Sequence, residues 1–168
     1  MGDEKEGPAV PGAQREDAAL QDQLAKIAAT APGIIYTFRI RPDGSASIPY
    51  ASPRIEDVYG IDPAKLAEDA SVALAMTHPE DAERFRESIA ESARTLSPWR
   101  CEYRILNPNK GVVWVEGHST PEREPDGGIL WRGFINDITE RKQTEQSLRA
   151  SEERYRSLFE NMSEGLAY

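Results

Sequence analysis

The amino-acid sequence predicts an α+β fold, in which a five-stranded antiparallel sheet carries helices on one face. Strand-like segments fall into two groups, helix-start signals lie between the groups, and turn residues separate the strands within each group. The first group is a hairpin of residues 34–40 and 47–51 around Pro42-Asp43-Gly44. We therefore expect the helices to be inserted between strands two and three.

The second group contains three strands. Residues 99–105 alternate apolar and charged side chains, which is typical of a strand with one buried face. Residues 107–111 form a turn into a strand at 112–119, and residues 125–128 form a turn into a last strand at 129–135. Three consecutive antiparallel strands follow from this order.

Two short helices should open the segment between the strand groups. Ser52-Pro53 is a helix start with Ser52 as the cap, and Gly60 ends that helix. Asp62-Pro63 opens the next. These helices would form an irregular flank over the sheet.

A longer helix should begin at Thr77-His78-Pro79-Glu80-Asp81. Thr77 or His78 caps it, Pro79 takes the first helical position, and the two acids favour the positive end of the helix dipole. An apolar stripe follows, made of Ala82, Phe85, Ile89 and Ala93. We expect this stripe to pack on the sheet.

The last strand runs into Asp137-Ile138-Thr139-Glu140-Arg141-Lys142, which resembles the end of a PAS domain. The resemblance extends back through His78-Pro79-Glu80-Asp81, through Cys101-Glu102-Tyr103-Arg104-Ile105 and through Gly111-Val112-Val113-Trp114-Val115. These segments stand in the order and spacing of a PAS subgroup with an HPED, EYRI, DITERK pattern, and they cover residues 24–142. The resemblance implies a PAS fold with an N-terminal helix and a C-terminal signal helix.

The resemblance also implies that the end of the last strand relays a signal to the outgoing helix. The residues concerned are Asp137, Ile138, Thr139, Glu140 and Arg141. Asp137 is placed to cap that helix, with Glu140 reaching back to it. A movement in the sheet would then displace the base of the helix.

The chain divides into five predicted parts. Residues 1–17 read as a disordered leader, residues 18–31 as a leading helix, residues 32–138 as the PAS domain and residues 139–162 as the signal helix. The leading helix either covers its own domain or packs on a partner subunit. Residues 163–168 resemble the start of a second PAS domain, because Ile27, Gly33 and Tyr36 each recur 132 residues later, as Phe159, Gly165 and Tyr168.

The signal helix carries a sparse apolar pattern. Leu148, Tyr155 and Leu158 recur at spacings that suit a parallel dimer. The alternative is a solvated linker helix, because few of these positions are strongly apolar. A homodimer is the partner that we expect first.

A ligand pocket would lie between the sheet and the helical flank. Its candidate lining residues are Phe38, Tyr50, Phe85, Ile89, Cys101, Tyr103, Val115 and Ile135. A fully packed domain without ligand is the alternative. The cofactor is unknown and none is indicated, because His78 fits a helix cap and Cys101 lies in a strand rather than in a flavin-adduct segment. No metal spacing and no catalytic constellation stands out.

Composition narrows the partners and the location. A net charge of -9 argues against binding nucleic acid through its phosphates. The single cysteine, Cys101, cannot form an internal disulfide, and no N-terminal apolar run is present, so we expect a cytoplasmic location without direct membrane contact. The resemblance implies neighbouring PAS and output domains, most often a histidine kinase, with a cyclic-dinucleotide cyclase or phosphodiesterase second.

Overall fold

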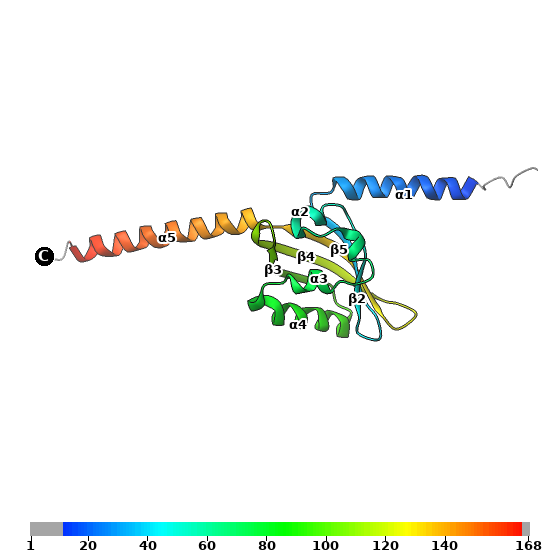
Figure 1. The fold of residues 1–168 in the computed structure, drawn as a ribbon. Coiled ribbons are helices and arrows are strands. Elements are labelled where there is room, and N and C mark those ends of the chain that lie inside the picture. The colour runs from blue at the N-terminus through cyan, green and yellow to red at the C-terminus, as the bar shows by residue number, and fades with distance from the viewer. Residues whose placement is uncertain (1–11, 166–168) are drawn as a thin grey trace, which may run out of the picture.

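The computed structural model describes residues 12–165, with side chains for residues 17–163. One antiparallel sheet has the strand order β2-β1-β5-β4-β3. Helices lie over one face of this sheet (Figure 1). The strands are β1 (Ile34–Ile40), β2 (Ala46–Ala51), β3 (Trp99–Asn107), β4 (Gly111–Arg123) and β5 (Ile129–Asp137). The predicted α+β fold, with five antiparallel strands and helices inserted between the second and the third, is confirmed.

The strands of the second group are longer than predicted, because hydrogen-bonded pairing with neighbouring strands extends beyond the predicted ends. β4 continues past Ser119 since its pairing with β5 reaches from Asp137 opposite Val115 to Ile129 opposite Arg123. β3 ends where Trp99 lies opposite Ser119. The following residues of β4, Pro121 among them, therefore form an edge, where proline is tolerated.

Four helical segments connect β2 to β3. They are α2 (Ile55–Tyr59), the 3₁₀ turn η1 (Pro63–Lys65), α3 (Ser71–Ala75) and α4 (Pro79–Thr95). α4 begins as predicted, with Pro79 in its first turn and His78 Nδ1 accepting a hydrogen bond from the Glu80 main-chain N–H at 3.2 Å. The Asp81 carboxylate then binds the Arg104 guanidinium on β3 at 2.9 Å, which fixes the start of α4 to the sheet.

Ser52 does not cap α2 as predicted. Its hydroxyl accepts a hydrogen bond from the Ile35 N–H at 3.0 Å, and its own N–H donates to the Ile35 carbonyl at 2.8 Å. The fully buried side chain therefore ties the end of β2 to β1, and α2 starts without a side-chain cap. Gly60, with φ of 72°, ends α2 as predicted.

The first and last helices extend away from the sheet in opposite directions (Figure 1). α1 (Gly12–Thr30) begins within the segment predicted to be a disordered leader, and α5 (Thr139–Gly165) continues past Met162. Residues 1–11 and 166–168, which hold the rest of that leader and of the predicted second-domain start, lie outside the described residues. None of the helices in the described part is long and apolar enough to span a membrane.

Both end helices attach at the same end of the sheet. β1 and β5 are antiparallel neighbours, and Ile34 lies opposite Ile135. The chain therefore enters from α1 beside the point where it leaves toward α5. α1 does not cover its own sheet, because Leu20, Leu24 and Ile27 are 56–58% exposed.

Candidate functional site

Aromatic side chains fill the space between the sheet and the helices. The Phe38 and Trp131 rings lie 5.6 Å apart, and Phe85 of α4 lies 4.5 Å from Tyr103 of β3. Trp99 lies across Gly117, where an added Cβ would come within 2.4 Å of its ring. Glycine is required there because the ring occupies the space of a side chain.

A cavity of about 60 Å³ remains within this aromatic layer, and we call it the inner cavity. Its walls come from β1, β2, β3, β4, β5 and the helical flank. They are formed by Tyr36, Phe38, Ile48, Ile55, Tyr59, Ala73, Leu74, Thr77, Phe85, Ile89, Trp99, Tyr103, Ser119, Trp131 and Ile135. Among the described residues, no charged side chain lines it.

Five of the eight predicted pocket residues line the inner cavity, and three do not. Those that do are Phe38, Phe85, Ile89, Tyr103 and Ile135. Tyr50, Cys101 and Val115 lie elsewhere. A cavity therefore lies between the sheet and the helices, but its walls differ from the predicted set, and its role as a ligand pocket stays a prediction.

Tyr50 lies outside because the strand register is irregular. β2 shifts against β1 between Thr37 and Arg39, and Ser47 and Ile48 are both buried where strict alternation would bury one. Ile48 lines the inner cavity, whereas Tyr50, two residues on, is 41% exposed. Alternation from the sequence could not reveal this shift.

Cys101 and Val115 are buried on the inner face but are covered by other side chains. The Cys101 sulfur lies 3.4 Å from the Arg84 guanidinium of α4, outside the inner cavity. Val115 is fully buried near the end of the sheet, between Tyr103 and Asp137 in its neighbouring strands. Both residues therefore pack the core.

The predicted set of pocket residues omitted several wall residues, of which Tyr36, Ser119 and Trp131 are central. Tyr36 shares a strand face with Phe38, and Phe38 lies opposite Trp131 in β5. Ser119 lies opposite Gly133 of β5 and Trp99 of β3. The register between strands would have found these residues, but alternation alone did not fix which face turns inward.

Hydroxyl groups are the polar chemistry of the inner cavity. The Tyr59 and Tyr103 hydroxyls form a hydrogen bond of 2.9 Å, and burial raises the pKa of both phenols. Burial also raises the pKa of Tyr36 to about 12. The Ser119 hydroxyl lies near Tyr36 but outside hydrogen-bond geometry, and it is buried without a partner among the described residues. All these groups are neutral at pH 7.

An open groove lies outside the inner cavity, between α4, α3 and the β1–β2 hairpin. Five side chains, Phe38, Leu74, Thr77, Phe85 and Ile89, border both spaces. The remaining walls of this outer groove are Ile40, Gly44, Ala46, Ala75, Ala82, Arg86 and Ala90. The inner cavity and the outer groove are therefore adjacent and share these five side chains as walls.

A second arrangement joins the sheet to α5. The Asp137 carboxylate accepts a hydrogen bond from the Thr139 N–H at 2.9 Å, so it caps the helix from two residues before its start. No hydrogen bond from Glu140 back to Asp137 is present among the described residues, and that part of the predicted cap is wrong. Ile138, between them, is buried and 6% exposed.

The first turn of α5 is bonded to β4 as well as to β5. The Ile138 N–H donates to the Trp114 carbonyl at 2.8 Å, and the Trp114 N–H donates to Thr139 Oγ1 at 3.1 Å. β5 has ended by this point, so Ile138 and Thr139 continue its pairing with β4 by one main-chain and one side-chain bond. The helix start is thus an extension of the sheet.

Ion pairs link the same helix turn to β3. Arg141 and Lys142 each reach the Glu102 carboxylate at 2.5 Å, and Arg141 lies 3.7 Å from Glu116. The hydrogen bond from Arg100 lowers the pKa of the buried Glu116 carboxyl. The base of α5 therefore contacts three strands of the sheet.

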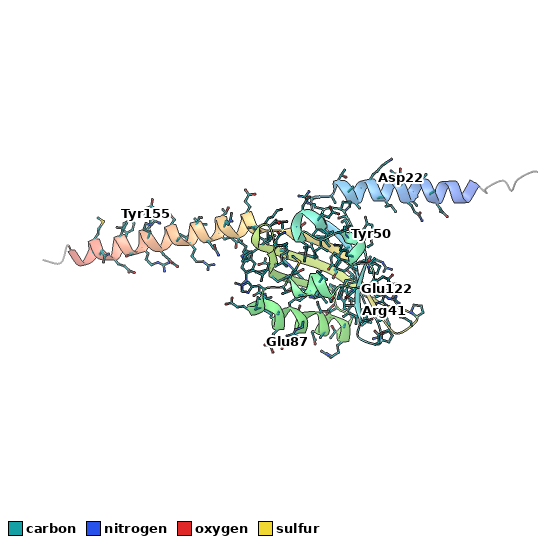
Figure 2. All side chains as sticks on the ribbon, in the orientation of Figure 1. Asp22, Arg41, Tyr50, Glu87, Glu122 and Tyr155 are labelled. Carbon is teal, nitrogen blue, oxygen red and sulfur yellow. The ribbon has the colours of Figure 1, made fainter. Side chains whose placement is uncertain are left out.

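Beyond this base, α5 carries exposed apolar side chains. Leu148, Tyr155 and Leu158 are 61%, 64% and 54% exposed. Figure 2 shows Tyr155 projecting from α5 far from the sheet.

The described residues contain no group of three or more His, Cys, Asp or Glu side chains that could hold a metal ion.

Comparison with known proteins identifies one matching family. The sequence model of the family described as PAS fold matches residues 48–135. A curated relative, the uncharacterized protein y4lL of Sinorhizobium fredii (strain NBRC 101917 / NGR234), is 32% identical over 120 residues, or 71% of this chain. The chain spans 14% of the length of that relative.

Solved structures of similar fold come from signalling proteins. A sensory box histidine kinase/response regulator from Burkholderia thailandensis E264 aligns with a TM-score of 0.58 at 22% identity, over 82% of this chain and 98% of the other. The N-terminal domain of a diguanylate cyclase with PAS/PAC sensor from Marinobacter aquaeolei aligns with a TM-score of 0.54 at 20% identity, over 64% of this chain and 98% of the other. A domain of the putative light and redox sensing histidine kinase from Haloarcula marismortui aligns with a TM-score of 0.55 at 24% identity, over 70% and 99%. At these identities the likenesses show a shared fold.

Proposed function

Because this chain belongs to the PAS-fold family, whose members are sensory modules of signalling proteins, we propose that it is the input module of a sensor histidine kinase. It relays a change in the sheet through Asp137, Ile138 and Thr139 to α5, and it joins two copies of the chain along α5. A PAS domain is itself a sensory module rather than a catalytic one. A cytoplasmic location and neighbouring PAS and output domains in the parent protein belong to this proposal.

The attachment of α5 to the sheet is the observation that carries the relay. Main-chain and side-chain hydrogen bonds hold Ile138 and Thr139 to Trp114 of β4, and ion pairs hold the next turn to Glu102 of β3. Lys142 also lies 4.9 Å from the centre of the Trp114 ring, which adds a cation–π contact. A shift of β3 or β4 relative to β5 therefore requires the helix base to move or these bonds to break.

The apolar stripe of α5 supports a second copy of this chain as the partner. Leu148 and Tyr155 are seven residues apart, and Met162 follows after another seven, each more than 60% exposed. A stripe repeating every seven residues is buried when two parallel helices supercoil. Helix propensity alone would make an isolated helix as polar as α5 only marginally stable in water, so packing against a second helix would supply the stabilising free energy.

Native mass spectrometry of the chain tests the dimer. We expect a dimer at about ten micromolar, converted to a monomer when Leu148, Tyr155 and Leu158 are replaced together by glutamine. The matched control replaces Gln146 by serine and Glu153 and Glu160 by glutamine on the opposite side of the helix, at roughly 100° per residue. A wild-type monomer at this concentration, or equal dissociation of the control, would contradict the dimer.

Two other functions have a specific observation in their favour. The fold is shared with a domain of a diguanylate cyclase, which makes a cyclic-dinucleotide cyclase or phosphodiesterase the second candidate for the output. The inner cavity favours a module that responds to a small molecule or cofactor. Incubating the parent protein with ATP or GTP separates the outputs, because a histidine kinase gives acid-labile phosphoprotein, whereas a cyclase gives a cyclic dinucleotide and no phosphoprotein.

A further inference from the structure

His118 lies on the outer face of the sheet, beside the ion pairs that hold the base of α5. Alternate residues of a strand share a face, so His118 and Glu116 lie on the same side of β4. The His118 ring stacks on Phe134 of β5, with ring centres 5.0 Å apart and ring planes 13° apart. In this position His118 Nε2 lies 3.4 Å from Glu116 Oε2. The imidazole is therefore held against a carboxylate that also contacts α5.

The Glu116 carboxylate divides its two oxygens among three partners. Oε1 accepts hydrogen bonds from Arg100 Nη2 at 2.7 Å and Nε at 3.1 Å. Oε2 lies 3.7 Å from Arg141 Nη1 of α5 as well as beside His118. The Glu116 side chain is 8% exposed, so water supplies little of its solvation and these partners supply the rest. His118 and Arg141 therefore share one carboxylate oxygen.

The charges of this ion-pair network balance while His118 is neutral. Three cations and three carboxylates from β3, β4 and α5 belong to it. They are Arg100, Arg141 and Lys142, and Glu102, Glu116 and Glu145. Farther along the same face, Arg132 of β5 is paired with Glu122 of β4. Protonation of His118 adds a fourth cation to the network without adding a carboxylate.

His118 is the member of this network that changes charge near neutral pH. A histidine side chain ordinarily titrates between about pH 5 and pH 8, whereas glutamate titrates at about pH 4 and lysine and arginine above about pH 10. The hydrogen bond from Arg100 lowers the pKa of Glu116, so this carboxylate stays ionised in that range. The His118 side chain is 32% exposed, so protons reach it from solvent. Acidification in this range therefore acts on the network through His118.

From this arrangement we infer that His118 is a proton-sensing site that controls how firmly α5 is attached to the sheet. The protonated imidazole competes with Arg141 for Glu116 Oε2 and repels the Arg141 guanidinium, so the base of α5 is held less firmly at acidic pH. The hydrogen bonds between Trp114 and the start of α5 remain, so protonation loosens the base without releasing it. The inference rests on the proposed relay and names proton concentration as its signal.

Amide hydrogen exchange of the full chain at about pH 5.5 and about pH 7.5 tests the inference. The Ile138 and Lys142 amides, which donate to the Trp114 and Ile138 carbonyls, report opening of the helix base. Each wild-type rate is divided by the rate in His118→Gln at the same pH, because intrinsic exchange itself depends on pH. We expect a ratio of about one at the higher pH and of about two to five at the lower pH, the range for one partly exposed ion pair.

Two further variants sharpen the test. His118→Arg carries a permanent planar cation that can still stack on Phe134, so its α5 base should exchange at the faster rate at both pH values. His78→Gln is the matched control, because it removes the only other histidine, at the start of α4, and should keep the wild-type pH response. The Ile48 amide on the opposite edge strand, which donates to the Leu66 carbonyl, should not respond to any of these changes. Urea unfolding verifies that each variant is folded.

Several results would overturn the inference. They are an exchange ratio that is equal at both pH values, His118→Arg behaving like His118→Gln, and loss of the pH response in His78→Gln. Acceleration of the Ile48 amide by the same factor would also overturn it, because the effect would then be a general loss of stability. A ratio that rises at low pH without any change in the separation of the two α5 helices of the dimer would support the proton site and contradict the relay. A constant ratio leaves the Trp114 hydrogen bonds and the relay standing, so the two proposals fail separately.

Discussion

Replacing Thr139 by valine should loosen the base of α5 without disturbing the sheet. Valine keeps the shape of the side chain but removes Oγ1, which accepts the Trp114 N–H at 3.1 Å. β5 does not reach Trp114, because its pairing with β4 ends at Asp137 opposite Val115. The substitution therefore leaves a partly buried main-chain N–H without its partner.

An unsatisfied buried donor destabilises a protein by about 1–3 kcal/mol. Because this contact is only partly buried, we expect a destabilisation of about 1–2 kcal/mol. Since 1.4 kcal/mol is a factor of ten in an equilibrium constant, local opening should become roughly 5- to 30-fold more frequent. Hydrogen exchange of the Ile138 and Lys142 amides, which donate to the Trp114 and Ile138 carbonyls, reports that opening.

Thr139→Ser is the matched control, because it retains the hydroxyl. We expect its Ile138 and Lys142 amides to exchange close to the wild-type rate, with the amides of β1 and β3 unchanged in both variants. Equal exchange in Thr139→Val and wild type would refute the argument that this hydrogen bond holds the helix to β4. So would equal acceleration in the serine variant.

Two further predictions concern contacts that fix the helices to the sheet. The hydrogen bonds from Arg104 lower the pKa of Asp81 to about 2, so its ionised form stabilises the fold above about pH 4 and that contribution is lost as pH falls toward 2. In urea unfolding at pH 7, Asp81→Asn should lower the free energy of unfolding by about 1–2 kcal/mol, a figure that is reduced because solvent screens the partly exposed Arg104. This loss of stability should shrink below pH 4, and a loss that stays constant with pH would contradict the prediction. Tyr103→Phe leaves the Tyr59 hydroxyl buried and unpaired, so it should lower the free energy of unfolding by about 1–3 kcal/mol. Adding Tyr59→Phe should restore most of this stability. A double variant less stable than Tyr103→Phe alone would contradict the prediction.

Elements with strong local signals could be predicted from the sequence. The start of α4 is specified by His78, Pro79 and the acids after them, all within a few residues, and it forms as expected. Gly60 ends α2 through a positive φ that glycine adopts easily. Such features depend on neighbours in the chain, so the sequence contains them.

Features set by long-range pairing could not be predicted. The shift of β2 against β1 turned Tyr50 outward and moved Ile48 into the inner cavity wall. Ser52 bonds to β1 rather than to its own helix, because Ile35 is close in space though distant in sequence. The Trp114 bond to Thr139 likewise joins residues far apart in the chain. Each of these depends on which strand lies beside which.

The residues that line the inner cavity also divide into those that a local pattern identifies and those that depend on strand pairing. Phe85 and Ile89 were identifiable from the apolar stripe of a single helix. Ser119 was not, because nothing local distinguishes a serine that faces an aromatic cavity from one that faces solvent. Its importance follows from the strands on either side, which place Gly133 and Trp99 beside it.

The distance between the two α5 helices of the dimer tests the relay most directly. Spin labels on a cysteine at Glu153, in a chain with Cys101→Ser, report that distance by pulsed electron resonance, and Ile135→Ala changes the inner cavity wall on β5. We predict that the distance distribution at position 153 shifts when Ile135 is replaced, although the two positions lie in different elements. An unchanged distribution in a folded, dimeric Ile135→Ala protein would contradict the claim that the sheet and the helix move together.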